Sequence, residues 1–330
     1  MRVRRRRMER RPERQRRLAG PVISVGNLSV GGTGKTPVVA AIAQWLVDAG
    51  ERPAILSRGY GRADAADGVV VVSDGRSILA GVERAGDEPL MLARQVPRAA
   101  VCVSPDRHLA GTLAERQLDC TVHVLDDGFQ HLELARGLDV LVTTIGEIPN
   151  GRVLPIGRLR EPIDAASRAH VLVVTDATAG AASAEAWTLG ISQSCGAARS
   201  LAAPVAIATE SGNQPASARE SSDELRRGLA RAIAVAGIAN PQRFFDALKA
   251  AGHVIAGEMA FPDHHRYTAA DVAAIGAKMQ ALDAEAIVTT DKDAVRLETL
   301  ELPMPAYRVP LTIAFDPPDV LFASVRAVLA

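Results

Sequence analysis

Short apolar runs alternate with segments of helical pattern along the first half of the chain. The segment 36–49 follows the first apolar run and a glycine-rich turn, and its pattern predicts a helix. Strands separated by helices are typical of a parallel sheet covered by helices, so we predict an α/β fold. The runs that predict buried strands are 22–25, 54–56, 69–72, 100–103, 121–125, 138–143 and 170–174.

The second half changes in composition before a second α/β block begins. Residues 178–228 are dominated by Ala, Ser, Gly and Glu, and Pro204 and Pro215 interrupt any long element. Strands are predicted at 231–237 and 286–289, with a helix at 244–251. The predicted parts are a basic arm (1–20), a core domain (21–177), a connecting region with room for one hairpin (178–228) and a smaller C-terminal α/β domain (229–330).

The composition is that of a globular protein and argues against several other classes. A chain of 330 residues that is 48% hydrophobic is long enough for two domains with buried cores. Aromatic residues make up only 3%, which argues against a stacking platform for single-stranded nucleic acid. The three cysteines lack C-x-x-C spacing, so neither a zinc site nor a disulfide framework is expected. No run approaches the roughly 18 to 20 apolar residues of a transmembrane helix.

A glycine-rich segment between the first strand and the first helix predicts a phosphate-binding loop. Backbone N–H groups at a helix N-terminus bind phosphate oxygens, Lys35 would reach the β- and γ-phosphates, and the Thr36 hydroxyl would bind Mg²⁺. The loop therefore predicts ATP and Mg²⁺ as cofactors. The residues predicted to contact the nucleotide are Ser29, Val30, Gly31, Gly32, Thr33, Gly34, Lys35 and Thr36.

The loop departs from the strict pattern at Ser29, where that pattern has glycine. The alternative is a glycine-rich strand-to-helix turn with a solvated lysine. The chain has 4 Lys among its 38 basic residues, leaving 34 Arg, so Lys35 stands where this sequence otherwise prefers arginine. The order of strand, turn, GKT and helix favours the phosphate loop.

Asp126 and Asp127 end an apolar run about 90 residues after the loop. A carboxylate at a strand end beside a phosphate loop is the arrangement that a Mg²⁺ ligand needs, although aspartate at strand ends also serves turns. Adjacent residues of an extended strand point to opposite faces, so one carboxylate is expected to face the metal. The other would support it or position the substrate.

Eight motifs follow one another in the chain, at residues 26–37, 57–61, 86–89, 106–108, 126–131, 158–162, 261–265 and 290–293. In this order they resemble the motifs of the tetraacyldisaccharide 4'-kinases. The resemblance covers residues 21–300 and implies a P-loop NTPase-like parallel-sheet domain with a second, smaller α/β domain. It also implies phosphorylation of the lipid A disaccharide precursor, a step of lipopolysaccharide synthesis.

The resemblance implies that Asp87 accepts the proton of the sugar hydroxyl and that His264 pairs with it. A carboxylate is a weak base at neutral pH, and coupling to an imidazole compensates for this. The alternative for Asp87 is a helix N-cap, because a helical pattern follows it. For His264 the alternatives are its neighbour His265, a metal site or a surface loop.

The same resemblance assigns further residues by motif position alone. Arg107 and Arg160 are expected to bind phosphates of ATP or of the substrate, because guanidinium groups bind phosphate through two hydrogen bonds. Glu88 and Glu161 are expected to hold metal or to orient an arginine. The motif around Lys292 has no assigned role, and Thr290 or Asp291 could simply cap a helix there.

The basic arm carries charge but no apolar face. Residues 1–17 hold ten Arg against two Glu, a net charge of +8, so the remaining residues carry −8. Each arginine near an anionic lipid surface contributes about 1 kcal/mol. One alternative is that the arm is a tail without a binding role. The other is that the start codon of the sequence is assigned too far downstream. The acidic body and the phosphate loop argue against nucleic acid as a partner.

The leading hypothesis is therefore an ATP- and Mg²⁺-dependent lipid A 4'-kinase, held peripherally at the cytoplasmic face of the bacterial inner membrane. One rival is a membrane-associated P-loop ATPase switch, whose phosphate loop carries a second lysine where this chain has Val30. The other rival is a different small-molecule kinase, because one fold supports many functions.

Overall fold

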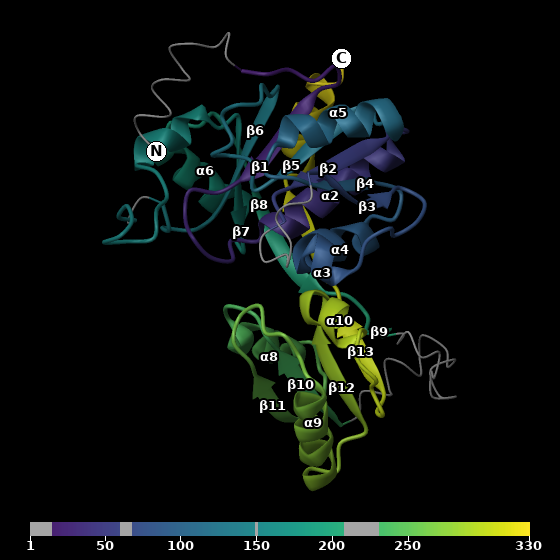
Figure 1. Ribbon diagram of the computed structural model, residues 1–330. Helices are drawn as coiled ribbons and strands as arrows, with labels where there is room; N and C mark the ends of the chain where they lie inside the picture. Colours follow the sequence, from purple (N-terminus) through teal and green to yellow (C-terminus); the bar gives the residue numbers. More distant parts are fainter. Residues whose placement is uncertain (1–14, 60–67, 149–150, 208–230) are drawn as a thin grey trace. The chain divides into compact units, whose positions relative to one another are not determined.

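The chain forms two compact units, which the computed structural model describes over residues 15–59, 68–148, 151–207 and 231–330 (Figure 1). Unit 1 contains the residues up to 199 together with 313–330, and unit 2 contains residues 200–312. Most of the predicted basic arm lies outside the described residues. Among the described helices, none has the length and apolar character needed to cross a bilayer.

Unit 1 is built on a nine-stranded sheet in which β1, β2 and β4 to β8 run parallel, while β3 is antiparallel to β4. Strands β6, β7 and β8 follow one another both in the chain and in the sheet, whereas β5 lies between β1 and β2. In spatial order the strands are β14 (Leu311–Asp316), β8 (Gln193–Leu201), β7 (Val171–Thr175), β6 (Leu138–Thr144), β1 (Val22–Gly26), β5 (Val122–Asp126), β2 (Pro53–Ser57), β4 (Ala100–Val103) and β3 (Val70–Asp74).

Helices cover the sheet, and the side chains of alternate strand residues meet them. On one face, Leu125 packs in a core with α5, and Leu141 packs in a core with α6 and η2. Helix α2 contacts β1, β2 and β5. The helices of unit 1 are α2 (Lys35–Asp48), α3 (Val82–Ala85), α4 (Asp87–Gln95), α5 (Arg107–Gln117), η2 (Ile163–Arg168), α6 (Ala179–Leu189) and α11 (Pro318–Ala327).

The unit boundaries differ from those predicted from the sequence. The expected connecting region begins with α6 and β8, which belong to unit 1. Thr178 caps α6 by accepting the N–H of Ala181, and β8 pairs with β7. Only the middle of β8 is buried, so its sequence lacks the apolar run of an inner strand. Residues 208–228 of the expected region lie outside the described part of the chain.

Helix α11 also belongs to unit 1, although the sequence placed it in the C-terminal domain. The ring of Phe322 stacks on Trp45 of α2 with centroids 5.4 Å apart, and the Arg326 guanidinium lies 5.8 Å from the Trp45 ring. Such contacts between distant parts of the chain leave no local signature. The chain therefore leaves unit 1 after β8, forms unit 2, and returns through β14.

Unit 2 is a smaller α/β unit in which β9 is antiparallel to β13 and the other strands are parallel. The strand order is β11 (Ile255–Ala260), β10 (Ala232–Ala236), β12 (Ala286–Thr290), β13 (Ala306–Val309) and β9 (Val205–Ala206). The helices are α8 (Pro241–Ala250), α9 (Ala269–Ala281) and α10 (Asp291–Leu297). The two sheets confirm the predicted α/β fold class.

Replacing Phe129 with alanine should lower the free energy of unfolding of unit 1 by about 3–5 kcal/mol, the usual cost of a large buried side chain. Phe129 is fully buried in the core with η2, and the Arg168 guanidinium lies 4.7 Å from its ring centroid. Urea denaturation followed by circular dichroism measures the change. Leu109→Ala, at a side chain 49% exposed on α5, is the control and should change little.

Candidate active site

The loop of residues 27–34 joins β1 to α2 at the carboxyl end of the strand. Gly31 and Gly34 have φ angles of 122° and 86°, values that glycine adopts readily. Among the described residues, no side chain caps α2, and its first turn holds no acidic residue. The first N–H groups of α2 thus remain available to an anion, which the helix dipole favours.

Polar side chains hold this loop from inside. The Nδ2 of Asn27 donates to Thr33 Oγ1 at 3.1 Å, and Asn27 Oδ1 accepts from the Lys35 ammonium at 3.1 Å. The Thr175 hydroxyl donates to the carbonyl oxygen of Thr33 at 3.2 Å. The loop is therefore shaped by contacts within unit 1.

Ser29, the departure from the strict loop pattern, has a structural use. Its side chain is buried, and its hydroxyl donates to Glu147 Oε1 at 2.7 Å. Its backbone forms an antiparallel bridge with Leu159. Glycine at this position would lose the hydroxyl contact and leave the partly buried Glu147 carboxylate with one donor fewer.

Asp127 lies between two cations at the end of β5. The Lys35 ammonium is 3.2 Å from Asp127 Oδ1, and Arg160 NH1 donates to Oδ2 at 2.7 Å. Burial opposes ionisation, but the charges of Lys35 and Arg160 outweigh it and hold the pKa of Asp127 below its ordinary value. The residue has a φ of 52°, a left-handed conformation that aspartate tolerates better than most residues.

Asp126 differs sharply from its neighbour. Its carboxylate is buried and accepts a hydrogen bond from the Ser57 hydroxyl at 3.1 Å. Burial, then the negative charges of Glu88 and Asp127, raise its pKa from 3.8 to about 7. Carboxylates crowded in this way suit a divalent cation, which offsets their mutual repulsion.

The donor set fits Mg²⁺ bound partly through other molecules. The described residues contain no group of three or more His, Cys, Asp and Glu side chains placed to hold a metal. Mg²⁺ usually binds through one or two carboxylates, with waters and substrate phosphates completing its shell. Asp126 and Thr36 are the residues that would hold it, with Asp127 and Glu88 supplying negative charge nearby. Thr36 is partly buried in the first turn of α2.

Arg107 begins α5 and lies in the field of the same carboxylates. It is 5% exposed, and burial followed by the charge of Arg58 lowers its pKa, while Asp126 and Asp127 act in the opposite direction. Its NH1 donates to the Pro105 carbonyl at 3.1 Å, and its buried Nε has no hydrogen-bond partner among the described residues. A desolvated guanidinium with an unused donor suits an anionic ligand.

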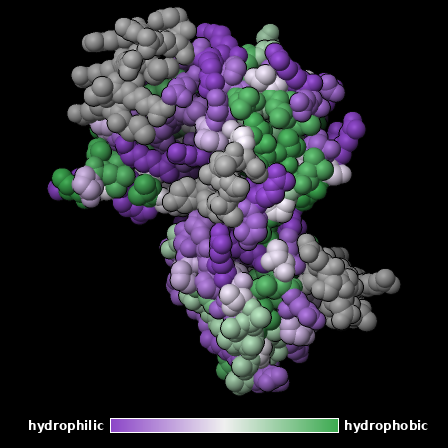
Figure 2. Space-filling view, viewed as in Figure 1, coloured by the Kyte–Doolittle hydropathy of each residue, from purple (hydrophilic) through white to green (hydrophobic). Residues whose placement is uncertain are grey.

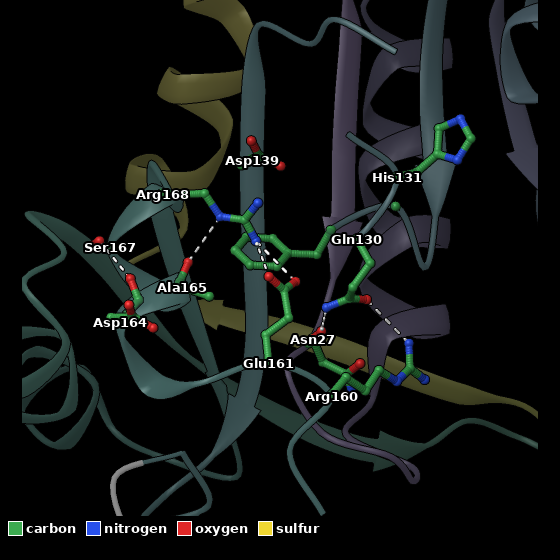
Figure 3. A network of polar contacts seen from close by, with 12 residues as sticks. Asn27, Gln130, His131, Asp139, Arg160, Glu161, Asp164, Ala165, Ser167 and Arg168 are labelled. Atoms are coloured by element: carbon green, nitrogen blue, oxygen red, sulfur yellow. Dashed lines mark hydrogen bonds and ion pairs between the residues drawn. The ribbon is translucent and has the colours of Figure 1, made fainter. Parts of the chain in front are cut away.

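Arg160 and Glu161, adjacent in sequence, serve different surroundings (Figure 3). Arg160 NH1 also lies 3.3 Å from Gln130 Oε1, and Gln130 in turn donates to the Asn27 carbonyl at 2.8 Å. Glu161 is buried and accepts from Arg168 NH2 at 3.2 Å. Glu161 thus forms an ion pair with Arg168, and its expected role stays a prediction.

Arg158 contacts the phosphate loop, although no role was predicted for it. Its Nε and NH2 donate to the Val30 carbonyl at 3.1 and 2.7 Å, and its carbonyl accepts from Val30 N–H at 2.9 Å. A Cβ at Gly31 would lie 2.1 Å from Arg158 NH2. The absence of a side chain at Gly31 therefore lets this guanidinium lie against the loop.

Asp87 is the first residue of α4 and is 2% exposed. Gly86, with a φ of 84°, occupies the N-cap position, and no side-chain cap hydrogen bond is found among the described residues at this helix start. The alternative in which Asp87 caps the helix is therefore wrong. Its neighbour Glu88 acts electrostatically on Asp126, so the start of α4 belongs to the carboxylate cluster.

In unit 2, His264 lies in a turn after β11 and contacts two basic side chains. Its Nε2 is 3.1 Å from the Lys292 ammonium, and its Nδ1 is 3.3 Å from Arg296 NH2. Lys292 also donates to Asp263 Oδ1 at 2.8 Å. His264 has a φ of 60°, a conformation uncommon for a residue other than glycine.

His265 and the residues that follow β12 have structural partners. His265 stacks on Phe261 with centroids 4.7 Å apart, and its Nε2 lies 3.1 Å from Asp271 Oδ2. Thr290 caps α10 by accepting the N–H of Asp293 at 3.1 Å, as the sequence suggested. Of the two neighbouring histidines, His264 is therefore the one whose ring contacts basic side chains, whereas the ring of His265 contacts Asp271.

Sequence reasoning missed several residues that the structure brings to these sites. Asn27, Ser57 and Gln130 lie within the quoted motifs, but their side-chain partners were not expected. Lys292 was left unassigned and contacts His264. Glu147 has no local signature, because its contact with Ser29 joins residues 118 positions apart.

Comparison with known proteins shows the family to which the chain belongs. The family model described as tetraacyldisaccharide-1-P 4'-kinase matches residues 1–330. The chain belongs to the tetraacyldisaccharide-1-P 4'-kinase family. The predicted family, fold class and enzyme class are confirmed.

Similar proteins support the same membership. The tetraacyldisaccharide 4'-kinase of Geobacter sulfurreducens is 42% identical over 316 residues, covering 95% of this chain and 85% of that protein. That of Pelobacter propionicus is 44% identical over 290 residues, covering 87% of this chain and 77% of its own. The crystal structure of LpxK from Aquifex aeolicus in complex with ATP has a TM-score of 0.77 and 29% identity, covering 99% of this chain and 94% of that one.

Replacing Asp126 with asparagine should stabilise the protein at pH 8 in the absence of Mg²⁺, and less so at pH 5. The unfolded chain ionises Asp126 near its ordinary pKa of 3.8, whereas the folded protein does so only near 7. This raised pKa lowers folding stability increasingly as pH rises between these values, and asparagine removes the effect. Thermal unfolding at both pH values measures it. Asp119→Asn, at an exposed carboxylate, is the control, and an equal gain at both pH values would contradict the prediction.

Proposed function

We propose that this protein transfers the γ-phosphate of ATP to the 4'-hydroxyl of a tetraacylated glucosamine disaccharide 1-phosphate, the precursor of lipid A. The observation that carries the proposal is the meeting of Lys35, Asp127 and Arg160 at the uncapped start of α2, in a member of a 4'-kinase family. The ATP complex of the Aquifex aeolicus protein supports ATP as the donor.

The phosphate loop and Lys35 would hold the β- and γ-phosphates. Lys35 is the first residue of α2, whose uncapped N–H groups would face the phosphates. Asp127 holds Lys35 in place from the other side. The bound Mg²⁺ would neutralise charge on the phosphate oxygens as the transfer proceeds. Asp126 and Thr36 are its proposed ligands.

Asp87 is the proposed general base. The 4'-oxygen bonds to the γ-phosphorus, the bond from that phosphorus to the bridging oxygen breaks, and ADP leaves, while the hydroxyl proton passes to the Asp87 carboxylate. The burial of Asp87 and its position next to Glu88 support this role. His264, in unit 2, is proposed to share the proton, and Lys292 would position its imidazole.

Arg107 and Arg160 are the proposed phosphate-binding arginines. Arg107 is desolvated and keeps a buried donor unused among the described residues. Arg160 is held by Asp127 and Gln130, and this fixes its guanidinium beside the loop. Fixed guanidinium groups stabilise charge that develops on a transferring phosphoryl group.

The protein is proposed to act peripherally at the cytoplasmic face of the inner membrane. A tetraacylated substrate is itself a bilayer lipid, so the acceptor hydroxyl would be met at the membrane surface. The predicted lipid attraction of the basic arm rests on residues that lie almost entirely outside the described part of the chain.

Incubation with ATP, Mg²⁺ and the tetraacyldisaccharide 1-phosphate tests the proposed reaction. Mass spectrometry should find the lipid heavier by one phosphate and ADP formed in equal amount. Hydrolysis of ATP without lipid phosphorylation would favour the ATPase switch. Phosphorylation of another acceptor in its place would favour a different small-molecule kinase.

Replacing Asp87 with alanine should lower kcat by ~10² or more, as the loss of a general base implies, and leave ATP affinity near that of the wild type. Single-turnover transfer and nucleotide titration measure the two effects separately. Glu83→Ala removes an exposed acid from the neighbouring helix α3 and should change neither. Unchanged transfer in Asp87→Ala would remove Asp87 from its proposed role.

A further inference from the structure

The segment 151–163, which follows β6 and ends at the first residue of η2, places several apolar side chains in solvent. The exposed fractions are 80% for Ile156, 48% for Leu154, 43% for Ile163 and 38% for Val153. Single exposed apolar residues are ordinary, but a contiguous group on one projecting segment marks a contact site. In Figure 2 the corresponding projection at the left edge is mostly green. We call residues 151–163 the apolar loop.

The apolar loop has a defined backbone. The N–H of Leu154 donates to the Leu159 carbonyl at 2.8 Å, and the N–H of Leu159 donates to the Arg152 carbonyl at 2.9 Å. At the tip, the N–H of Ile156 donates to the Val153 carbonyl at 3.2 Å. A Cβ at Gly157 would lie 2.2 Å from the Arg152 carbonyl oxygen. The loop therefore holds its apolar tip away from the core instead of folding it inward.

The charges that the apolar loop presents to solvent are positive. Arg152 and Arg158 are exposed, and Arg160 is partly buried. Its one acidic residue, Glu161, is buried and paired with Arg168. Arginine beside apolar side chains is the combination that places a segment at the boundary between lipid headgroups and acyl chains.

We propose that the apolar loop docks on an anionic lipid bilayer, with Leu154 and Ile156 entering the interface and Arg152 meeting lipid phosphates. The proposal rests on the proposed function, in which the acceptor is a bilayer lipid. A hollow of about 530 Å³, lined by the tip and by Pro162 and Ile163, provides further apolar surface for the lipid. The positive charge of the loop favours anionic over neutral headgroups.

The apolar loop lies next to the groups that are proposed to bind phosphate, so docking at its tip would bring these groups to the membrane surface. Two residues of the apolar loop contact the phosphate loop. Arg158 is hydrogen-bonded to Val30, and Leu159 forms a β-bridge with Ser29. The next residue, Arg160, holds Asp127. The tip that would bind the bilayer is thus only a few residues away in the sequence from Arg158 and Arg160, which contact the phosphate loop and Asp127.

Vesicle flotation of the full chain tests the docking directly. Vesicles of phosphatidylcholine with phosphatidylglycerol should bind the wild type more strongly than phosphatidylcholine alone. The double variant Leu154→Glu/Ile156→Glu should bind the anionic vesicles about tenfold or more weakly, since each apolar side chain withdrawn from water contributes at least that factor. Val254→Glu, at a side chain 56% exposed before β11 in unit 2, is the matched control and should bind as the wild type does.

A thiol label measures insertion of the tip itself. Cys102, Cys120 and Cys195 are buried, and burial raises their pKa values to about 12, 11 and 12, so a new exposed cysteine is labelled selectively. A polarity-sensitive fluorophore on Ile156→Cys should shift to the blue with anionic vesicles and be quenched by brominated acyl chains. The same fluorophore on Val254→Cys should do neither.

Two results would overturn the proposal. One is undiminished vesicle binding by a double variant whose thermal unfolding matches the wild type, together with an unshifted label at position 156. The other is undiminished vesicle binding with a raised KM for the disaccharide in detergent micelles, which would make the apolar loop a site for substrate acyl chains. Vesicle binding is measured without ATP or disaccharide, so a failure of the proposed phosphoryl transfer would leave this test unaffected.

Discussion

The free amino end of α2 is the constraint around which unit 1 is arranged. A helix start without a capping side chain leaves N–H groups to be satisfied by a ligand, and a lysine in its first turn adds positive charge. In unit 1, Asp127 forms ion pairs with both Lys35 and Arg160 and so holds the two cations close together. Removing Asp127 would leave both Lys35 and Arg160 without the carboxylate that they share.

Backbone strain coincides with the proposed chemistry at two places. In the described part of the chain, five residues other than glycine have positive φ, and four of them are aspartates, which tolerate that region. Asp127 is one of the four and turns the chain immediately after β5. The fifth is His264, whose side chain lies among Lys292 and Arg296. Strain of this kind persists where the surrounding contacts hold it, and it gathers at functional sites.

The phosphate loop and the inner strands were predictable because their signals are local. Apolar runs and the glycine spacing before Lys35 are written in consecutive residues. The contact of Ser29 with Glu147 and that of Lys292 with His264 join distant segments, so no spacing rule reveals them. Strand β8 escaped notice because only its centre is buried. The ionisation of Asp126 also depends on Glu88, which reaches it only through the fold.

The return of the chain through β14 and α11 sets the order in which the protein can form during synthesis. Unit 1 lacks an edge strand and the helix stacked on Trp45 until residues 313–330 have emerged from the ribosome. Unit 2 is complete by then. At about 5–20 residues per second, translation of residues 200–312 delays closure of the nucleotide-binding unit by roughly ten seconds. During that interval the flank of β8 and the surface of α2 around Trp45 stay open to chaperones.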